Sequence, residues 1–347
     1  MVRKMLYALL FVLVVAASLL AYPVIRIKMT DTVNPVPGPF FSSDDAGTRL
    51  YRHVHHLSVT IGSRSVFEVE RLDRAEQYIL SVLKESGLSA ERQTFDYEGR
   101  PYHNLIVTID GLERREETVI IGAHYDTIEG TPGADDNASG VAVLLELCRA
   151  LRDFRPERTL KLIFFTLEEP PVFSTSRMGS YVCASEARRR GEAVHGMISL
   201  EMVGYYDDRE GSQAFPLPGM GAMFSKRGNF IGVVGNLPSR ELVASVANAL
   251  KRASPLPVES LAAPPFIPGI SFSDHGSFWK AGYRAVMITD TAFYRNPNYH
   301  TAGDTVETLR FDRMAELLRG MVHVAHTLAG TSGAGSEGPL PIPPQGG

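Results

Sequence analysis

Residues 118–147 constrain the fold more than any other part of the sequence, because they join a buried strand, a polar loop and an apolar helix. The segment 119–122 is a short apolar run bounded by turn-forming residues, which is typical of an inner strand of a sheet. We expect this strand to end just before His124 and Asp126. In an open α/β sheet, ligands bind at the carboxyl ends of the strands, so both side chains fall where a functional site is expected.

The loop after this strand carries two further carboxylates. It reads GADDNASG and contains Asp135 and Asp136, and apolar residues at helical spacing follow over 141–151. Because the loop is tight, both carboxylates are expected to stay beside the sheet edge at which the strand ends. A strand, a polar loop and a helix in this order indicate one unit of an α/β sheet.

The rest of the chain repeats this alternation of strands and helices. Strand patterns are expected at 90–95, 102–109, 159–166, 197–202, 230–234 and 284–289, and helical patterns at 46–57, 67–83, 174–190, 239–253, 277–281 and 314–329. The first two strands form a hairpin through a Glu-Gly turn. We therefore predict an α/β fold: a three-layer sandwich with a mixed, centrally parallel β-sheet and an antiparallel hairpin at one edge.

Length and composition allow one large domain. The chain has 347 residues, and 44% of them are hydrophobic, which is enough for a single extensive core. A net charge of -4 gives no basic surface for nucleic acid, so nucleic-acid binding is not expected. We place the domain at 46–330, with a long Pro- and Gly-containing insertion at 205–229. The tail at 331–347 is rich in Gly, Ser and Pro and is expected to be disordered.

Residues 1–30 contain an apolar run preceded by two basic residues. Arg3 and Lys4 come before 6–25, which carries no formal charge. A run of about twenty residues can span a bilayer, and the basic flank keeps the N-terminus in the cytoplasm. We expect a single-pass anchor in the cell membrane with the domain outside the cytoplasm, or alternatively a signal segment whose cleavage gives a secreted or periplasmic protein. Residues 31–45, which contain three prolines, are expected to be a linker.

Two groups of potential ligand residues have simpler interpretations. The chain has two cysteines, Cys148 and Cys183, which is too few for a disulfide framework, and whether they pair stays open. His53, His55 and His56 lie close together in one predicted helix. No acidic element accompanies them, so we interpret them as packing on a helix face rather than as metal ligands.

Acidic and imidazole side chains follow three more strands. Glu168 and Glu169 come directly after an apolar strand, Glu201 ends another, and His300 lies in a loop after the strand at 284–289. Because parallel strands bring their carboxyl ends to one edge, we expect these side chains to converge with those of the first segment. A mixed set of imidazoles and carboxylates suits zinc, and a bridging carboxylate suits two metals about 3.5 to 4 Å apart.

Five motifs resemble those of the M28 family of zinc peptidases, which includes co-catalytic aminopeptidases. They are HYD, GADDNASG, EE, LEM and YHTAGDT, in the family's order and at similar spacing, and the resemblance covers about residues 45–330. It implies a zinc-dependent exopeptidase (phosphorylase/hydrolase-like) fold, two zinc ions per chain, and peptide substrates with a free N-terminus. The ligands that it implies are His124, Asp136 as the bridge, Glu169, Glu201 and His300.

The resemblance also implies roles for side chains around the metals. Glu168 would be the general base, and Asp126 would hydrogen-bond the second ring nitrogen of His124. Tyr299 would stabilise the oxyanion, with Tyr294 as the alternative. This chemistry suits peptide hydrolysis, because zinc lowers the pKa of a bound water to about 7 and a base can carry its proton to the leaving amine.

We predict a zinc-dependent peptide hydrolase, an aminopeptidase that removes N-terminal residues. A glutaminyl cyclase, which uses the same architecture with a single zinc, stays open as an alternative, as does a non-catalytic ectodomain that works by binding. The second is disfavoured because all five ligand positions are intact.

The segment 272–276 resembles an active-site segment of relatives, although a helix N-cap at Ser273 or Asp274 also explains it. The insertion at 205–229 is expected to form a wall or lid of the substrate pocket. The sequence leaves open the preferred N-terminal residue and the oligomeric state.

Overall fold

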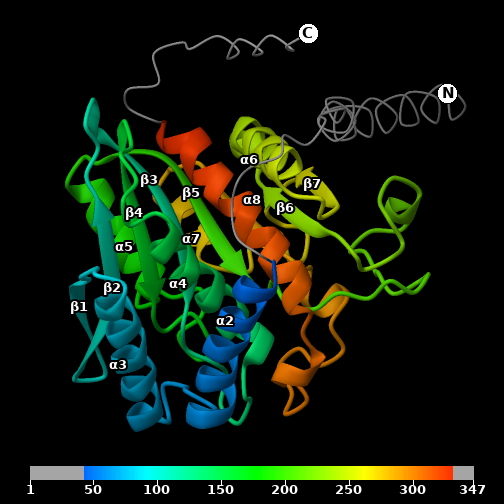
Figure 1. Cartoon of the computed structure of the whole chain (residues 1–347), viewed down its shortest axis with the longest axis horizontal. Helices are drawn as coiled ribbons and strands as arrows, with labels where there is room; N and C mark the ends of the chain where they lie inside the picture. The colour runs from blue at the N-terminus through cyan, green and yellow to red at the C-terminus, as the bar shows by residue number, and fades with distance from the viewer. Residues whose placement is uncertain (1–42, 331–347) are drawn as a thin grey trace, which may run out of the picture.

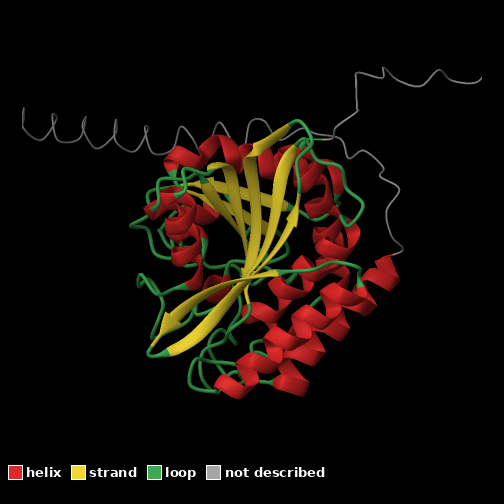
Figure 2. Cartoon of the chain, turned by 90° about the vertical axis from the view of Figure 1, so that its left-hand side faces the viewer, coloured by secondary structure: helices red, strands yellow, loops and turns green. Residues whose placement is uncertain are grey.

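The computed structural model describes residues 43–330 (Figure 1). The predictions for the apolar segment at 1–30, most of the linker and the tail at 331–347 lie outside these residues. Within 43–330, a single mixed sheet is covered by helices on both faces, which confirms the three-layer α/β sandwich (Figure 2). None of the helices in this range is long and apolar enough to cross a membrane.

The sheet of the described region has eight strands. They are β1 (Glu91–Tyr97), β2 (Arg100–Ile109), β3 (Arg114–His124), β4 (Arg158–Phe165), β5 (Ala193–Glu201), β6 (Ile231–Gly235), β7 (Val258–Ala262) and β8 (Ala285–Thr289). Their order is β1-β2-β4-β3-β5-β8-β6-β7. β4, β3, β5 and β8 run parallel at the centre, and β1 and β2 form the predicted antiparallel hairpin at one edge. At the other side β6 is antiparallel to β8, so the sheet is mixed.

The helices divide between the two faces because alternate strand residues point to opposite sides. The helices are α2 (Ser43–His55), α3 (Val69–Glu85), α4 (Gly140–Ala150), α5 (Gly179–Arg189), α6 (Arg240–Ala253), α7 (His275–Lys280) and α8 (Phe311–Ala329). Val119 and Ile121 of β3 join the larger apolar core with α2, α4, α6 and α8. Ile120 points the other way, into a smaller core that contains Cys183 of α5 and Phe278 of α7.

Several elements differ from the prediction. β3 extends to His124 itself, so this side chain leaves from the last strand position rather than from the loop. β7 has no counterpart in the sequence-based assignment, because its short, half-polar run VESLA gives only a weak strand pattern. α5 begins at Gly179 because the residues after Pro170 and Pro171 form turns. α2 begins at Ser43, inside the range expected to be linker.

The histidine group is used in helix packing, as expected. His53 is buried, and its Nδ1 lies 2.7 Å from the Tyr78 hydroxyl of α3 while its Nε2 lies 3.3 Å from Oε1 of Glu146 in α4. His56 stacks on the Tyr78 ring at 4.0 Å. These contacts connect α2, α3 and α4 through one polar cluster. The two cysteines, in α4 and α5, are both buried and free, so they do not pair.

The Glu146 carboxylate of this cluster predicts a pH dependence of stability. Burial opposes its charge, but hydrogen bonds from His53, Arg149 and Arg49 hold the pKa of Glu146 at about 2, below its ordinary value of 4.5. A depressed folded-state pKa adds stability above the ordinary pKa, and this stability is lost as the pH falls toward 2. Glu146→Gln should therefore lower the free energy of unfolding by on the order of 2 kcal/mol near neutral pH, and this deficit should shrink below about pH 4.5.

Urea unfolding measures this difference, with the fluorescence of Trp279, the single tryptophan of the chain, as the signal. Asp153→Asn is a matched control, because the Asp153 side chain is 88% exposed. A deficit of Glu146→Gln that is the same at neutral pH and near pH 3 would contradict the assigned ionic role.

Candidate metal centre

Imidazole and carboxylate side chains meet at the carboxyl ends of neighbouring strands. His124 ends β3 and Glu201 ends β5, while Glu169 follows β4. These strands are adjacent in the sheet, so residues far apart in sequence come together at one edge. His300 reaches the same place from the loop after β8, and Asp136 from the π-helical turn at Ala134–Ser139.

Two trios of ligand atoms form around one shared carboxylate. His124 Nε2 lies 3.4 Å from Oδ1 of Asp136 and 3.2 Å from Oε2 of Glu201. His300 Nε2 lies 3.2 Å from Oδ2 of Asp136 and 3.5 Å from Oε2 of Glu169. Within each trio the ligand atoms lie within 4.8 Å of one another. Asp136 thus presents one oxygen to each trio, as a bridging ligand would.

The geometry of the trios fits zinc. Two ligand atoms bound at 2.0 to 2.1 Å to a tetrahedral zinc ion lie about 3.3 Å apart, which matches the four imidazole-to-carboxylate distances. His124 Nε2, Asp136 Oδ1 and Glu169 Oε1 are buried and have no hydrogen-bond partner among the described residues. Buried polar atoms without partners are costly, and a bound cation would satisfy all three.

The charges of the site also favour a cation. Burial raises the pKa of Glu169 to about 7, with Asp136 adding to the shift. Burial opposes the charge of Asp136 too, but the neighbouring imidazoles of His124 and His300 hold the pKa of this carboxyl below its ordinary value. Several carboxylates are thus confined in one buried space, where a divalent ion stabilises their charged forms.

Glu168 lies beside the two trios but belongs to neither of them. Burial raises the pKa of Glu168 well above 4.5; the charge of His124 opposes this shift and the carboxylate of Glu169 adds to it. A carboxyl group with a raised pKa can take a proton near neutral pH and give it back. The position and environment of Glu168 thus fit the acid-base role that the sequence analysis expects for it.

Asp126 orients the two glutamates through their backbone. Its Oδ1 accepts a hydrogen bond from the amide of Glu168 and its Oδ2 one from the amide of Glu169, both at 3.1 Å. Oδ1 of Asp126 also faces the second ring nitrogen of His124, as expected, at 3.6 Å from Nδ1, slightly longer than a hydrogen bond. Both oxygens are aligned on the backbone amides, so Asp126 mainly fixes the turn after β4.

Side chains that the sequence analysis did not assign hold the bridging loop in place. Asp304 accepts hydrogen bonds from the amides of Asp135 at 2.8 Å and Asp136 at 3.0 Å. Asn137 donates to the carbonyl of Leu200 at 2.8 Å and accepts from the amide of Met202. Because Leu200 and Met202 flank Glu201, these bonds join the two ligand-bearing segments. Asp304 and Asn137 do lie inside the motifs YHTAGDT and GADDNASG, which is the signal that could have found them.

Arg64 had no such signal. Its side chain is fully buried, and it donates to the carbonyls of Tyr125 at 2.7 Å, Pro132 at 2.8 Å and Gly133 at 2.9 Å. These carbonyls lie on both sides of the loop between β3 and Asp136. Arg64 therefore joins the two ends of this loop by hydrogen bonds. Nothing in the sequence around Arg64 indicates this role.

The Ser273 side chain contacts the candidate metal centre and does not cap a helix. Its hydroxyl donates to Oε2 of Glu201 at 2.7 Å and lies 2.9 Å from the hydroxyl of Ser199. Of the two residues expected at the N-cap of α7, Asp274 occupies this position, although its side chain makes no capping hydrogen bond. Ser273 instead fixes the orientation of one ligand carboxylate.

The two candidate tyrosines differ in their contacts. The Tyr294 hydroxyl donates to the carbonyl of Pro268 at 3.2 Å. The Tyr299 ring stacks on His300 with centroids 3.7 Å apart, and burial raises the pKa of Tyr299, which keeps its hydroxyl protonated as a donor. Of these contacts, only that of Tyr299 involves a candidate metal ligand.

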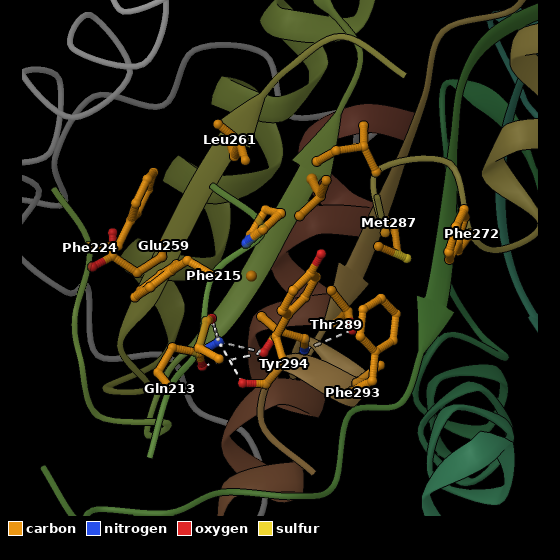
Figure 3. Close-up of a pocket in the computed structure, with 18 of the residues that line it drawn as sticks. Gln213, Phe215, Phe224, Glu259, Leu261, Phe272, Met287, Thr289, Phe293 and Tyr294 are labelled. Atoms are coloured by element: carbon orange, nitrogen blue, oxygen red, sulfur yellow. Dashed lines mark hydrogen bonds between the residues drawn. The ribbon is translucent and has the colours of Figure 1, made fainter. Parts of the chain in front are cut away.

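An apolar pocket opens next to Glu201 and Tyr299 (Figure 3). It encloses about 830 Å³, part of which is open to solvent. As expected, the insertion contributes a wall. Met220 and Phe224 of the insertion form a small apolar cluster with Phe215 and Leu261. Further apolar walls come from other segments, and they are Phe230, Val234, Ile270, Phe272, Met287 and Phe293.

The paired acceptor role of Asp126 gives a testable prediction. In Asp126→Asn one oxygen is replaced by an NH2 group, so the amide of Glu168 or Glu169 loses its acceptor and the turn shifts. We expect zinc affinity to fall about 10- to 100-fold, as measured by competition with a chromogenic chelator. The exposed change Asp153→Asn should leave the affinity unchanged. Equal affinities of Asp126→Asn and the parent protein would contradict the positioning role.

Comparisons with known proteins agree with this geometry. The chain is 42% identical to the Escherichia coli (strain K12) protein YfbL, an uncharacterized protein, over 79% of this chain and 86% of YfbL. It is 27% identical to leucine aminopeptidase 1 of Uncinocarpus reesii over 74% of this chain and 62% of that protein. The zinc aminopeptidase BSAP of Bacillus subtilis has the same fold, with a TM-score of 0.62 at 14% identity over 81% of this chain and 94% of that one. The sequence model of peptidase family M28 matches residues 104–325. The chain therefore belongs to peptidase family M28 and is a zinc-dependent peptide hydrolase.

Proposed function

We propose that this protein is an aminopeptidase that binds two zinc ions and removes apolar residues from the N-terminus of peptides. The observation that carries the proposal is the pair of ligand trios joined by Asp136, directly beside a pocket with mostly apolar walls. The first zinc would be held by His124, Asp136 and Glu201. The second would be held by Asp136, Glu169 and His300.

Zinc held by these residues would supply Lewis-acid chemistry, which polarises a peptide carbonyl and lowers the pKa of a water molecule. In the proposed mechanism Glu168 accepts a proton from the attacking water and returns it to the leaving amine. Tyr299 donates a hydrogen bond to the oxygen on which negative charge develops. Asp126 keeps Glu168 and Glu169 in their relative positions through their backbone amides.

The substrate's N-terminal residue would be recognised through its side chain and its ammonium group. Its side chain would enter the apolar pocket between the insertion and β6, β7 and β8. Its ammonium group would pair with the carboxylate oxygen of Glu169 or Glu201 that the metals leave free. Because these carboxylates are buried, such a pair is stronger than it would be in water.

Similarity to leucine aminopeptidase 1 supports the choice of an aminopeptidase. This chain spans only 62% of that protein's length, so the substrate preference is our proposal for this chain. A glutaminyl cyclase is the second candidate, because it is expected to use nearly the same ligands. The second ligand trio favours the peptidase, since a cyclase is expected to need a single zinc.

We also propose that the domain works outside the cytoplasm. The apolar run at 6–25 behind Arg3 and Lys4 supports a single-pass membrane anchor, and a cleaved signal segment is the alternative. Peptides in the extracytoplasmic space would then be the substrates.

N-acetylation of the substrate tests the aminopeptidase reaction. An acetylated peptide cannot supply an ammonium group, so a buried carboxylate stays unpaired at a cost of about 1 to 3 kcal/mol. We expect kcat/KM of the zinc-loaded enzyme to fall at least about tenfold between Leu-anilide and N-acetyl-Leu-anilide. Equal rates on both substrates would overturn the aminopeptidase function.

The cyclase is tested in the same series. A peptide with an N-terminal Gln should lose this residue by hydrolysis, with free glutamine as the product. Formation of pyroglutamyl peptide with release of ammonia would instead support the cyclase and contradict the peptidase.

A further inference from the structure

We propose that Phe173 and Phe272 form a second subsite, which binds an apolar side chain on the residue that follows the cleaved bond. This inference rests on the proposed aminopeptidase function and extends it to the leaving part of the substrate. It starts from a row of aromatic rings whose far end, Phe272 and Phe173, has no role in the proposed catalytic chemistry.

The row begins at the candidate metal ligand His300 and ends at Phe173. Tyr299 stacks on His300, and the Phe293 ring lies 5.5 Å from Tyr299. Phe272 follows at 6.3 Å from Phe293, and Phe173 at 6.0 Å from Phe272 in an edge-to-face arrangement of 82°. Phe272 is 44% exposed and Phe293 is 40% exposed. Large aromatic rings thus face solvent next to the catalytic residues, where an apolar ligand would cover them.

The strand order tells which part of a substrate reaches the far end of this row. The pocket for the N-terminal side chain lies over β6, β7 and β8. Phe173 follows β4, and β3 and β5 stand between β4 and β8 in the sheet. Phe173 does not line the pocket, whereas Phe272 does. A peptide whose first side chain fills the pocket therefore extends away from it, toward Phe173.

The position of the general base leads to the same side. Glu168 returns its proton to the nitrogen of the leaving residue, so this residue lies next to Glu168. The amide of Phe173 donates to the carbonyl of Glu169 at 3.1 Å, which fixes Phe173 to the turn that carries both glutamates. The side chain of the leaving residue is thus brought close to the pair of Phe173 and Phe272.

The chemistry of the pair defines its ligand. Two rings in edge-to-face contact offer an apolar surface without a charge, which fits an aliphatic or aromatic side chain. The preferred substrates would accordingly carry apolar residues at both of their first two positions.

Two peptide amides test the proposal. Leu-Phe-amide and Leu-Gly-amide share the first residue and differ only in the side chain that the subsite would receive. We expect the zinc-loaded enzyme to hydrolyse Leu-Phe-amide with kcat/KM about tenfold higher than Leu-Gly-amide, mainly through a lower KM. In Phe173→Ala and Phe272→Ala this ratio should fall to within about twofold of one, and Phe272→Leu should keep an intermediate ratio.

The ratio is measured on one preparation at a time, so a loss of folded enzyme or of metal cancels. Phe266→Ala is the matched control, because Phe266 is 83% exposed and makes no contact with the row, and it should keep the parent ratio. A parent enzyme that cleaves both peptides at equal rates, or variants that retain the tenfold ratio, would overturn the subsite while leaving the aminopeptidase intact. Failure of the parent enzyme to cleave either peptide would contradict the proposed function, and the subsite with it.

Discussion

The shared carboxylate of Asp136 is the constraint on which the rest of the site depends. It must present one oxygen to His124 and the other to His300, although the two histidines come from opposite parts of the chain. A buried carboxylate keeps such a position only if its backbone is fixed and its charge is balanced. Asp304 fixes the backbone through two amides, and the imidazoles with the expected zinc ions balance the charge. The parallel strands supply the remaining ligands at the same edge.

The pocket depends on the loop that carries His300 as well. Arg295 is buried and donates to the carbonyls of Phe230 at 2.8 Å and Tyr205 at 3.3 Å, at the two ends of the insertion. Its Nε also donates to Gln213 at 2.9 Å, and Gln213 donates to Thr291. The insertion and the His300 loop are therefore joined by one buried polar network. The wall that selects a side chain and a residue that binds metal are thus held as one unit.

Much of the fold could be predicted because its signals are local. The central strands have continuous apolar runs that end in His124, Glu168 or Glu201, so both the parallel sheet and its functional edge are readable from the sequence. β7 was missed because it is a short edge strand whose two polar residues are adjacent, so its sequence does not alternate and resembles a loop. Arg64 and Ser273 could not be assigned, since their roles come from contacts with segments distant in the chain.

The measurement that tests this arrangement most directly is the zinc content of Glu168→Gln together with its turnover. Glu168 belongs to neither ligand trio, and glutamine keeps its size without a carboxylate. We expect the purified variant to bind two zinc ions per chain, as the parent enzyme should, by elemental analysis, and to hydrolyse Leu-anilide at least about a thousandfold more slowly. A variant that loses zinc, or one that keeps its activity, would contradict the separation of the base from the metal ligands.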